Sequence, residues 1–183
     1  MKPHVKQLLL KLVFVTVSLL ILFNLNLAAS KKTTAITQGF PIRLVIPIIN
    51  VDAPIQQLGV ITNGEMDAPS NAADAGWFKL GSRPGEKGSA VIAGHFNGIN
   101  DEVGVFFNLY LLKKGDKIYI KDDKGRTIAF VVRESRIYDP GYADSVFSRN
   151  DGTYLNLITC DGVWDGVKKS YSKRLVVFAD IID

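Results

Sequence analysis

Cysteine and histidine are nearly absent from this sequence, which contains one cysteine, Cys160, and two histidines, His4 and His95. One cysteine excludes an internal disulfide, and three such side chains fall short of the four ligands that a structural zinc site usually needs. A phosphate-binding loop is absent too, because the glycine-rich segment at 81–89 lacks the G-x-x-x-x-G-K spacing. We therefore expect neither a metal ion nor a cofactor.

Calcium is the one metal for which the sequence offers any ligands. Two Asp-Gly pairs, Asp161-Gly162 and Asp165-Gly166, supply carboxylates close together in the chain. They lack the spacing of an EF-hand loop, and Asp-Gly is far more typical of a turn. The sequence favours a turn at both pairs.

Charge of one sign is nowhere concentrated. The net charge is +4, with 22% charged and 47% hydrophobic residues. The lysines occur in scattered pairs without interleaved aromatic residues, at Lys31-Lys32, Lys113-Lys114 and Lys168-Lys169. This distribution indicates a solvated surface and excludes a nucleic-acid site of the usual basic kind. The composition and length are typical of one globular domain.

The N-terminus has the pattern of an export signal. Lysines at positions 2, 6 and 11 precede an apolar run over residues 12–29. This run exceeds the roughly 7 to 15 residues of the hydrophobic region in a cleaved signal peptide, although Ala28-Ala29-Ser30 offers small residues that a signal peptidase accepts. We favour an uncleaved transmembrane anchor at 12–29, with residues 1–11 in the cytoplasm and the rest of the chain outside.

After a polar linker at 30–40, the pattern becomes that of β-strands. Short β-branched and aromatic runs are separated by Asn-Gly, Pro-Gly and Asp-Lys-Gly turns. Helical signal is weak and confined to segments such as 105–112. The domain at 41–183 is therefore predicted to be all-β, a barrel or a sandwich. The predicted runs are IRLVIPIINV, DAPIQQLGV, SAVIAGH, DKIYIKD, RTIAFVVRESRIY, YLNLITC and KRLVVFADII.

Cys160 ends one of these runs, at the polar end of its predicted strand. A free cysteine is often only a small buried hydrophobe. However, an exported thiol without a disulfide partner, beside one available imidazole, favours a chemical role. His4 precedes the membrane segment, so His95, at the end of SAVIAGH, is that imidazole. An imidazole can stabilise a thiolate and later protonate a leaving amine, although a structural histidine is the alternative.

Arg174 is a candidate for a third role. It opens the strand RLVVFADII, which follows the Cys160 strand in sequence, so both residues can reach the same end of a barrel. A fixed cation there would stabilise an oxyanion on a carbonyl under attack. A plain surface charge is the alternative for any single arginine.

The chain resembles the sortases, cysteine transpeptidases of the Gram-positive cell surface. The resemblance runs from about Pro41 to Ile182, and its parts occur in the family's order. NLITC resembles the T-L-x-T-C signature around the nucleophile, with asparagine at the first position as its one departure. The other matching parts are IRLVIPIINVDAPI, GWFKLGSRPGEKGSAVIAGH, FFNLYLLKKGDKIYI and KRLVVFA.

The resemblance implies a closed eight-stranded β-barrel with short helices in its connections. It implies that Cys160 attacks the Thr-Gly bond of an LPXTG-like sorting signal, that His95 protonates the leaving amine, and that Arg174 holds the oxyanion. Thr159 is implied to shape the substrate site. The thioester would pass to an amine acceptor, such as a cell-wall precursor or a pilin lysine. The short Cys160–Arg174 connection and the lack of an Asp-Pro-aromatic lid resemble the compact class E or F-like sortases.

Two other functions stay open at this point. A thiol hydrolase would use the same residues but release its product to water. A membrane-tethered β-barrel binding module would keep Cys160 and His95 only as core residues. A thiol-reactive probe separates the binding module from the two enzymes, and an added amine separates the two enzymes from each other.

Overall fold

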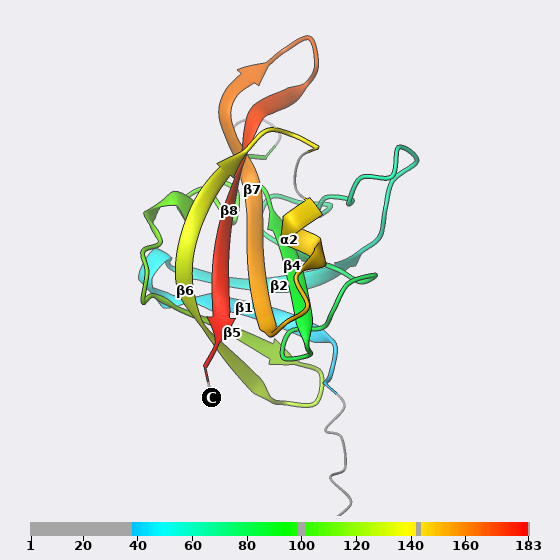
Figure 1. The fold of residues 1–183 in the computed structure, drawn as a ribbon. Helices are drawn as coiled ribbons and strands as arrows, with labels where there is room; N and C mark the ends of the chain where they lie inside the picture. Colours follow the sequence, from blue (N-terminus) through cyan, green and yellow to red (C-terminus); the bar gives the residue numbers. More distant parts are fainter. Residues whose placement is uncertain (1–37, 99–101, 142–143, 183) are drawn as a thin grey trace, which may run out of the picture. The chain divides into compact units, whose positions relative to one another are not determined.

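Eight strands close into a barrel in the computed structural model, which describes residues 38–98, 102–141 and 144–182 (Figure 1). Around the barrel the order is β1-β2-β3-β4-β7-β8-β6-β5, and β5 pairs back onto β1. The predicted closed eight-stranded barrel is confirmed. The strands are β1 (Pro41–Ile46), β2 (Val51–Leu58), β3 (Ala75–Phe78), β4 (Gly88–Gly94), β5 (Lys117–Asp122), β6 (Thr127–Tyr138), β7 (Thr153–Asp165) and β8 (Ser170–Ile181).

Short helices occupy the connections, as predicted. They are the 3-10 helices η1 (Pro47–Ile49) and η3 (Leu109–Leu111) and the α-helix α2 (Asp144–Ser148). The weak helical signal at 105–112 corresponds to turns followed by η3. Its apolar residues Phe106, Leu109 and Leu112 are buried in the core, as their spacing predicts.

Alternation along the strands separates the barrel interior from an outer face. On β7 the side chains of Leu155 and Leu157 belong to the interior core, and on β8 those of Leu175, Val177 and Ala179 do. Successive strand residues point to opposite sides, so the residues between these face outward. The outer face consists here of the outward side chains of β4, β7, β8 and β6.

Part of this outer face is covered rather than exposed to solvent. Val146 of α2 packs with Val91 of β4 and with Val176 and Phe178 of β8 in a second, smaller buried cluster. Figure 1 shows α2 lying on the outside of the barrel beside β4 and β7. The outer face is therefore hydrophobic under α2 and open on both sides of it.

None of the strand runs predicted from the sequence includes β3. This strand has four residues and includes a glycine, so it is too short to show a period. It forms because both neighbours complete it: β2 pairs with it in parallel and β4 pairs with it antiparallel.

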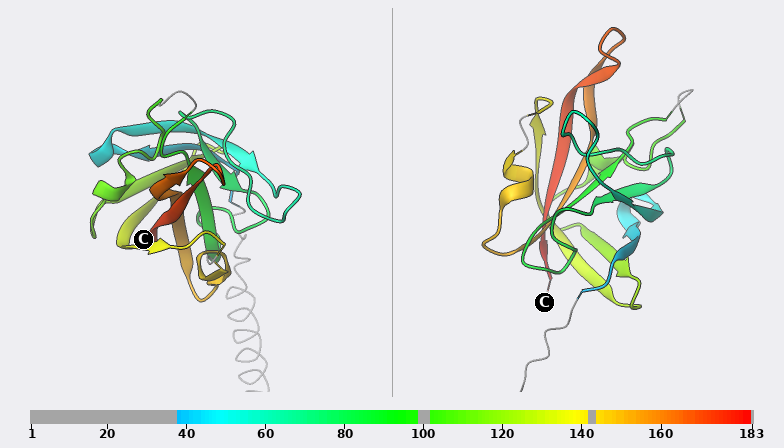
Figure 2. Two further views of the ribbon diagram at one scale, coloured as in Figure 1. Left: turned by 90° about the horizontal axis from the view of Figure 1, so that it is seen from above. Right: turned by 90° about the vertical axis from the view of Figure 1, so that its right-hand side faces the viewer.

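Strands β7 and β8 extend as a hairpin beyond the rest of the barrel, as Figure 1 and the right view of Figure 2 show. Asp165 accepts hydrogen bonds from the backbone N–H groups of Val167 and Lys168 at the tip, so the Asp165-Gly166 pair is a turn, as predicted. The turn predicted at Asp161-Gly162 is wrong. This pair lies inside β7, where the register shifts by a bulge and Gly162 has φ +81°.

The predicted cytoplasmic segment and membrane anchor, and most of the predicted linker, fall in residues 1–37, outside the described residues. Among the described residues, none of the helices has the length and apolar character needed to cross a membrane.

Candidate active site

Strand register places Cys160 and Arg174 next to each other on the outer face. The two residues are directly paired across β7 and β8, and Arg174 is also paired with Tyr138 of β6. Directly opposite residues of an antiparallel pair point to the same side of the sheet. The side chains of Cys160 and Arg174 therefore emerge together where the β7–β8 hairpin leaves the barrel.

The guanidinium of Arg174 is held in place by the hairpin. It donates to the carbonyl oxygens of Tyr171 and Lys173, both at 2.9 Å, and to the hydroxyl of Ser170 at 3.1 Å. No carboxylate of the described residues forms an ion pair with Arg174 within 4.0 Å. Its charge is fixed in position and is not neutralised by an acidic partner there.

The thiol of Cys160 is partly buried, and its environment acts on its pKa in two directions. Burial raises the pKa above its ordinary value, because the thiolate is poorly solvated, and the positive charge of Arg174 opposes this rise. Burial is the larger effect. Cys160 therefore rests as a neutral thiol near pH 7, and attack on a carbonyl requires a base to take its proton.

Thr159 links the strand of Cys160 to the strand that leads to His95. Its hydroxyl donates to the carbonyl oxygen of Gly94 at 2.8 Å, and the Thr159 side chain is only 3% exposed. Gly94 ends β4 and His95 follows it directly. The bond therefore connects the residue before the thiol to the residue before the imidazole, and it fixes the end of β4 against the middle of β7.

The ring of His95 has a defined tautomer. Its Nε2 lies 2.8 Å from the carbonyl oxygen of Pro69, which can only accept a hydrogen bond. Nε2 therefore carries a proton, and in the neutral ring Nδ1 carries the lone pair. A neutral His95 can accept a proton at Nδ1 and give it up again from the same atom.

One pocket of about 790 Å³ contains all four predicted site residues: Cys160, His95, Arg174 and Thr159. Its walls are mainly apolar and come from the β2–β3 connection, the segment around α2 and the outer face. The apolar wall residues are Val60, Met66, Ala68, Pro69, Phe78, Ala93, Pro140, Phe147 and Ile158.

Several residues of these walls were not predicted from the sequence. Met66 and Pro69 come from the irregular segment between β2 and β3, and Phe147 comes from a five-residue helix. None of them belongs to a strand run or to a motif quoted above. The one available signal was that Met66 and Pro69 lie in a long connection, where binding residues are common.

Comparison with known proteins identifies a family. The family model described as the sortase domain matches residues 44–182. No curated protein matched the sequence.

Solved structures agree with this match. The crystal structure of sortase C-1 from Actinomyces oris is 28% identical, with a TM-score of 0.62, and the alignment covers 78% of this chain and 73% of that one. Sortase A from Corynebacterium diphtheriae is 25% identical, with a TM-score of 0.62, and the alignment covers 81% of this chain but only 63% of that one. On the family match and these structures together, the chain belongs to the sortase family, whose members are cysteine transpeptidases.

Proposed function

We propose that this chain cleaves a sorting-signal peptide through a Cys160 thioester and transfers the acyl group to an amine. The observation that carries the proposal is the pairing of the Cys160 thiol with the unneutralised Arg174 guanidinium in one pocket with His95. A nucleophile, a proton carrier and an oxyanion donor are the three parts that acyl transfer requires.

In the first half-reaction, the Sγ of Cys160 attacks the peptide carbonyl carbon while His95 takes the thiol proton. The guanidinium of Arg174 donates to the oxygen that becomes negative. The tetrahedral intermediate then collapses, the C–N bond breaks, and His95 returns its proton to the leaving amine. The product is a thioester on Cys160, and the intermediate is stabilised at the site where its charge develops.

In the second half-reaction, an acceptor amine attacks the thioester carbonyl, and His95 takes the amine proton. The carbon–sulfur bond then breaks, and His95 returns the proton to the sulfur, which restores the thiol of Cys160 and the neutral imidazole. The acceptor class proposed is an amine of a cell-wall precursor or a pilin lysine.

The pocket walls support an LPXTG-like substrate. Apolar surface around the thiol, including Met66, Phe78 and Phe147, would bury a Leu-Pro pair, and burial of apolar surface favours binding. We place Thr159 among the residues that shape this site. The similar structures reported above are of sortases A and C, and the compact class E or F-like assignment stays a prediction.

The proposal includes a location. The apolar run at 12–29 would anchor the chain in the membrane, with the catalytic domain outside the cytoplasm. Surface proteins that carry a sorting signal would reach the Cys160 pocket on that side.

Mass spectrometry tests the proposal. The full chain in detergent is incubated with LPXTG-like peptides, with and without an amine such as triglycine, next to Cys160→Ala. We expect a peptide adduct on Cys160 and an amine-dependent transfer product, and neither in Cys160→Ala, which keeps its fold because little volume is lost. A product that does not change when the amine is added would favour a hydrolase. Turnover by Cys160→Ala would end the thioester mechanism.

A further inference from the structure

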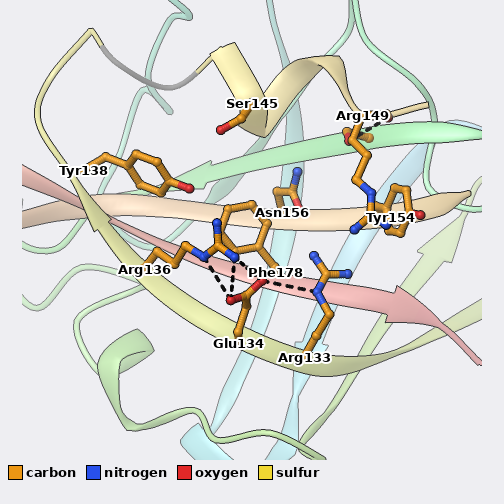
Figure 3. A pocket seen from close by; sticks show the side chains of 10 residues that line it. Arg133, Glu134, Arg136, Tyr138, Ser145, Arg149, Tyr154, Asn156 and Phe178 are labelled. Carbon is orange, nitrogen blue, oxygen red and sulfur yellow. Dashed lines mark hydrogen bonds and ion pairs between the residues drawn. The ribbon is translucent and has the colours of Figure 1, made fainter. Parts of the chain in front are cut away.

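A second pocket, of about 160 Å³, lies on the outer face beside α2 (Figure 3), and Cys160 is not among the residues that line it. Ser145 and Arg149, from α2 and the residue after it, line this pocket, whereas Phe147 and Ser148 line the pocket of Cys160. Strands β6, β7 and β8 supply the rest, together with Ser89 of β4. The proposed acyl transfer uses none of the side chains in this second pocket, which is called the Asn156 pocket below.

Asn156, which lines the pocket, has a hydrogen-bond acceptor that receives no hydrogen bond. The side chain is 2% exposed, and its Nδ2 donates to the carbonyl oxygen of Val146 in α2 at 2.5 Å. Its Oδ1 is buried and has no hydrogen-bond partner among the described residues. A buried carbonyl without a donor destabilises the folded chain, so an unpaired oxygen on a residue that lines a pocket points to a ligand that supplies an N–H or an O–H.

Positive charge predominates in the lining of the Asn156 pocket. Three arginines, Arg133, Arg136 and Arg149, face one carboxylate, Glu134. The outer partners of Arg133 and Arg149 are Asp180 and Asp151, which do not line the pocket. Hydrogen bonds to Glu134, Asp180 and Asp151 use two of the five N–H donors on each guanidinium. Arg136 has a further hydrogen bond with Tyr138, so at least two donors remain on each guanidinium to bind an anion.

Two aromatic rings hold the guanidinium groups in place. The Arg149 guanidinium carbon lies 4.1 Å from the ring centre of Tyr154, and that of Arg136 lies 5.6 Å from the ring centre of Phe178. Figure 3 shows the Tyr154 ring beside the Arg149 side chain and the Phe178 ring beside Arg136. Donors that are already oriented lose less conformational entropy when a ligand binds.

We propose that the Asn156 pocket binds a carboxylate with a neighbouring N–H group, which is the chemistry of the C-terminal residue of a peptide. The N–H donates to Asn156 Oδ1, and the carboxylate accepts from the arginines. A simple anion satisfies the arginines but leaves Oδ1 unpaired. A simple ammonium ion pairs Oδ1 but leaves the remaining guanidinium N–H donors without an acceptor. A ligand that carries both an N–H group and a carboxylate therefore fits the residues that line the pocket.

The ligand would lie close to the proposed active site without occupying it. Asn156 precedes Cys160 by four positions on the same face of β7, a separation of roughly 13 Å at the usual rise of a strand. Binding in the Asn156 pocket does not depend on the thiol chemistry, so the two proposals can fail separately.

The test is an NMR titration of the ¹⁵N-labelled full chain in detergent with three probes. N-acetyl-Ala-Ala has both groups, its ester analogue N-acetyl-Ala-lactate lacks the N–H, and its C-terminal amide lacks the carboxylate. We expect N-acetyl-Ala-Ala to shift the Asn156 side-chain signal and the signals of Arg149 and Phe178. The ester and the amide should each bind about tenfold more weakly, since each loses one hydrogen-bonded or charged contact.

Two variants complete the test. In Asn156→Leu, the peptide and the ester should bind equally, because the acceptor is gone. Arg149→Gln should weaken N-acetyl-Ala-Ala about tenfold, whereas Arg43→Gln, which removes an exposed arginine paired with Asp52 on the far strands, should not. If Asn156→Leu does not fold, the ratio of ester to peptide affinity on the unaltered protein still decides. Equal affinity for peptide and ester, equal affinity for acetate, or shifts confined to the Cys160 pocket would each overturn the proposal.

Discussion

The two pockets beside α2 use arginine in opposite ways. In the Cys160 pocket, Arg174 is held by carbonyl and hydroxyl oxygens and has no carboxylate partner among the described residues. In the Asn156 pocket, each of the three arginines is paired with a carboxylate. An unneutralised cation gains most when a negative charge forms beside it, as in an acyl-transfer intermediate. Guanidinium groups that are paired with carboxylates instead offer oriented N–H donors to a ligand that already carries a negative charge.

Replacement of His95 should separate the two pockets most strongly, with a large loss of turnover at the Cys160 pocket and no change in binding at the Asn156 pocket. His95→Ala removes the proton carrier, so turnover of a sorting peptide should fall about 10²- to 10⁴-fold. The same variant should leave binding of N-acetyl-Ala-Ala to the Asn156 pocket unchanged. Steady-state rates across a pH series measure the first effect, and NMR titration measures the second. An unchanged rate at every pH would return His95 to a structural role.

Arg174→Lys tests whether charge alone is enough in the Cys160 pocket. Lysine keeps the charge but loses the planar group that donates at once to the hairpin oxygens and to an oxyanion. Loss of one such donor typically lowers turnover about 10²- to 10³-fold. Arg43→Lys, at an exposed ion pair, is the matched control and should keep its rate. Circular dichroism checks folding, and a wild-type rate for Arg174→Lys would contradict the assignment.

Thr159→Val should have an intermediate effect. Valine keeps the shape of the side chain but removes the buried hydrogen bond to the Gly94 carbonyl. The position of Cys160 relative to His95 should therefore be less well fixed. We expect turnover to fall about tenfold and the free energy of unfolding to fall by about 1 kcal/mol. Thr159→Ser should recover most of both, because it keeps the hydroxyl. A change in KM alone would instead indicate that Thr159 contacts the substrate.

The pH dependence of Cys160 alkylation should give the smallest effect. Only the thiolate reacts with iodoacetamide, and burial raises the pKa of Cys160, so the midpoint should lie above the ordinary value of about 8.5. Arg174→Gln removes the charge that opposes this rise, so its midpoint should be higher still. A midpoint below that of a free cysteine, or one that does not respond to Arg174→Gln, would show that the charge of Arg174 does not reach the thiol.

Local sequence was sufficient for the strands that carry the site. The strand ends predicted at Cys160 and Arg174 are wrong, because β7 and β8 continue past both residues to form the hairpin that ends at Asp165 and Ser170. Long β-branched runs predicted β4, β6, β7 and β8, and the end of the β4 run located His95 directly after that strand. These predictions succeed because strand alternation is a local property of the chain. The count of eight strands came from the family resemblance, since β3 is stabilised by its neighbours and not by its own four residues.

The pairing of Cys160 with Arg174 depended on the tertiary structure. The hairpin tip pairs Asp165 with Ser170, and continuing that register without a bulge would place Cys160 opposite Leu175. The bulge at Gly162 shifts the register by one residue, which brings the thiol and the guanidinium to the same face. The sequence has an Asp-Gly pair at this point. Asp-Gly pairs occur both in turns and in bulges, so the sequence alone did not predict the bulge.

The two pockets also depended on contacts between distant segments. The sequence determined an all-β domain, a single thiol with one imidazole in that domain, and an asparagine at position 156, where the family signature has threonine. Only the folded chain brings Met66 and Pro69 into one pocket with the thiol and joins Asn156 to α2 through the hydrogen bond to Val146. The physical reason is that periodicity and turn chemistry act over a few residues, whereas a pocket forms where side chains far apart in sequence exclude water together.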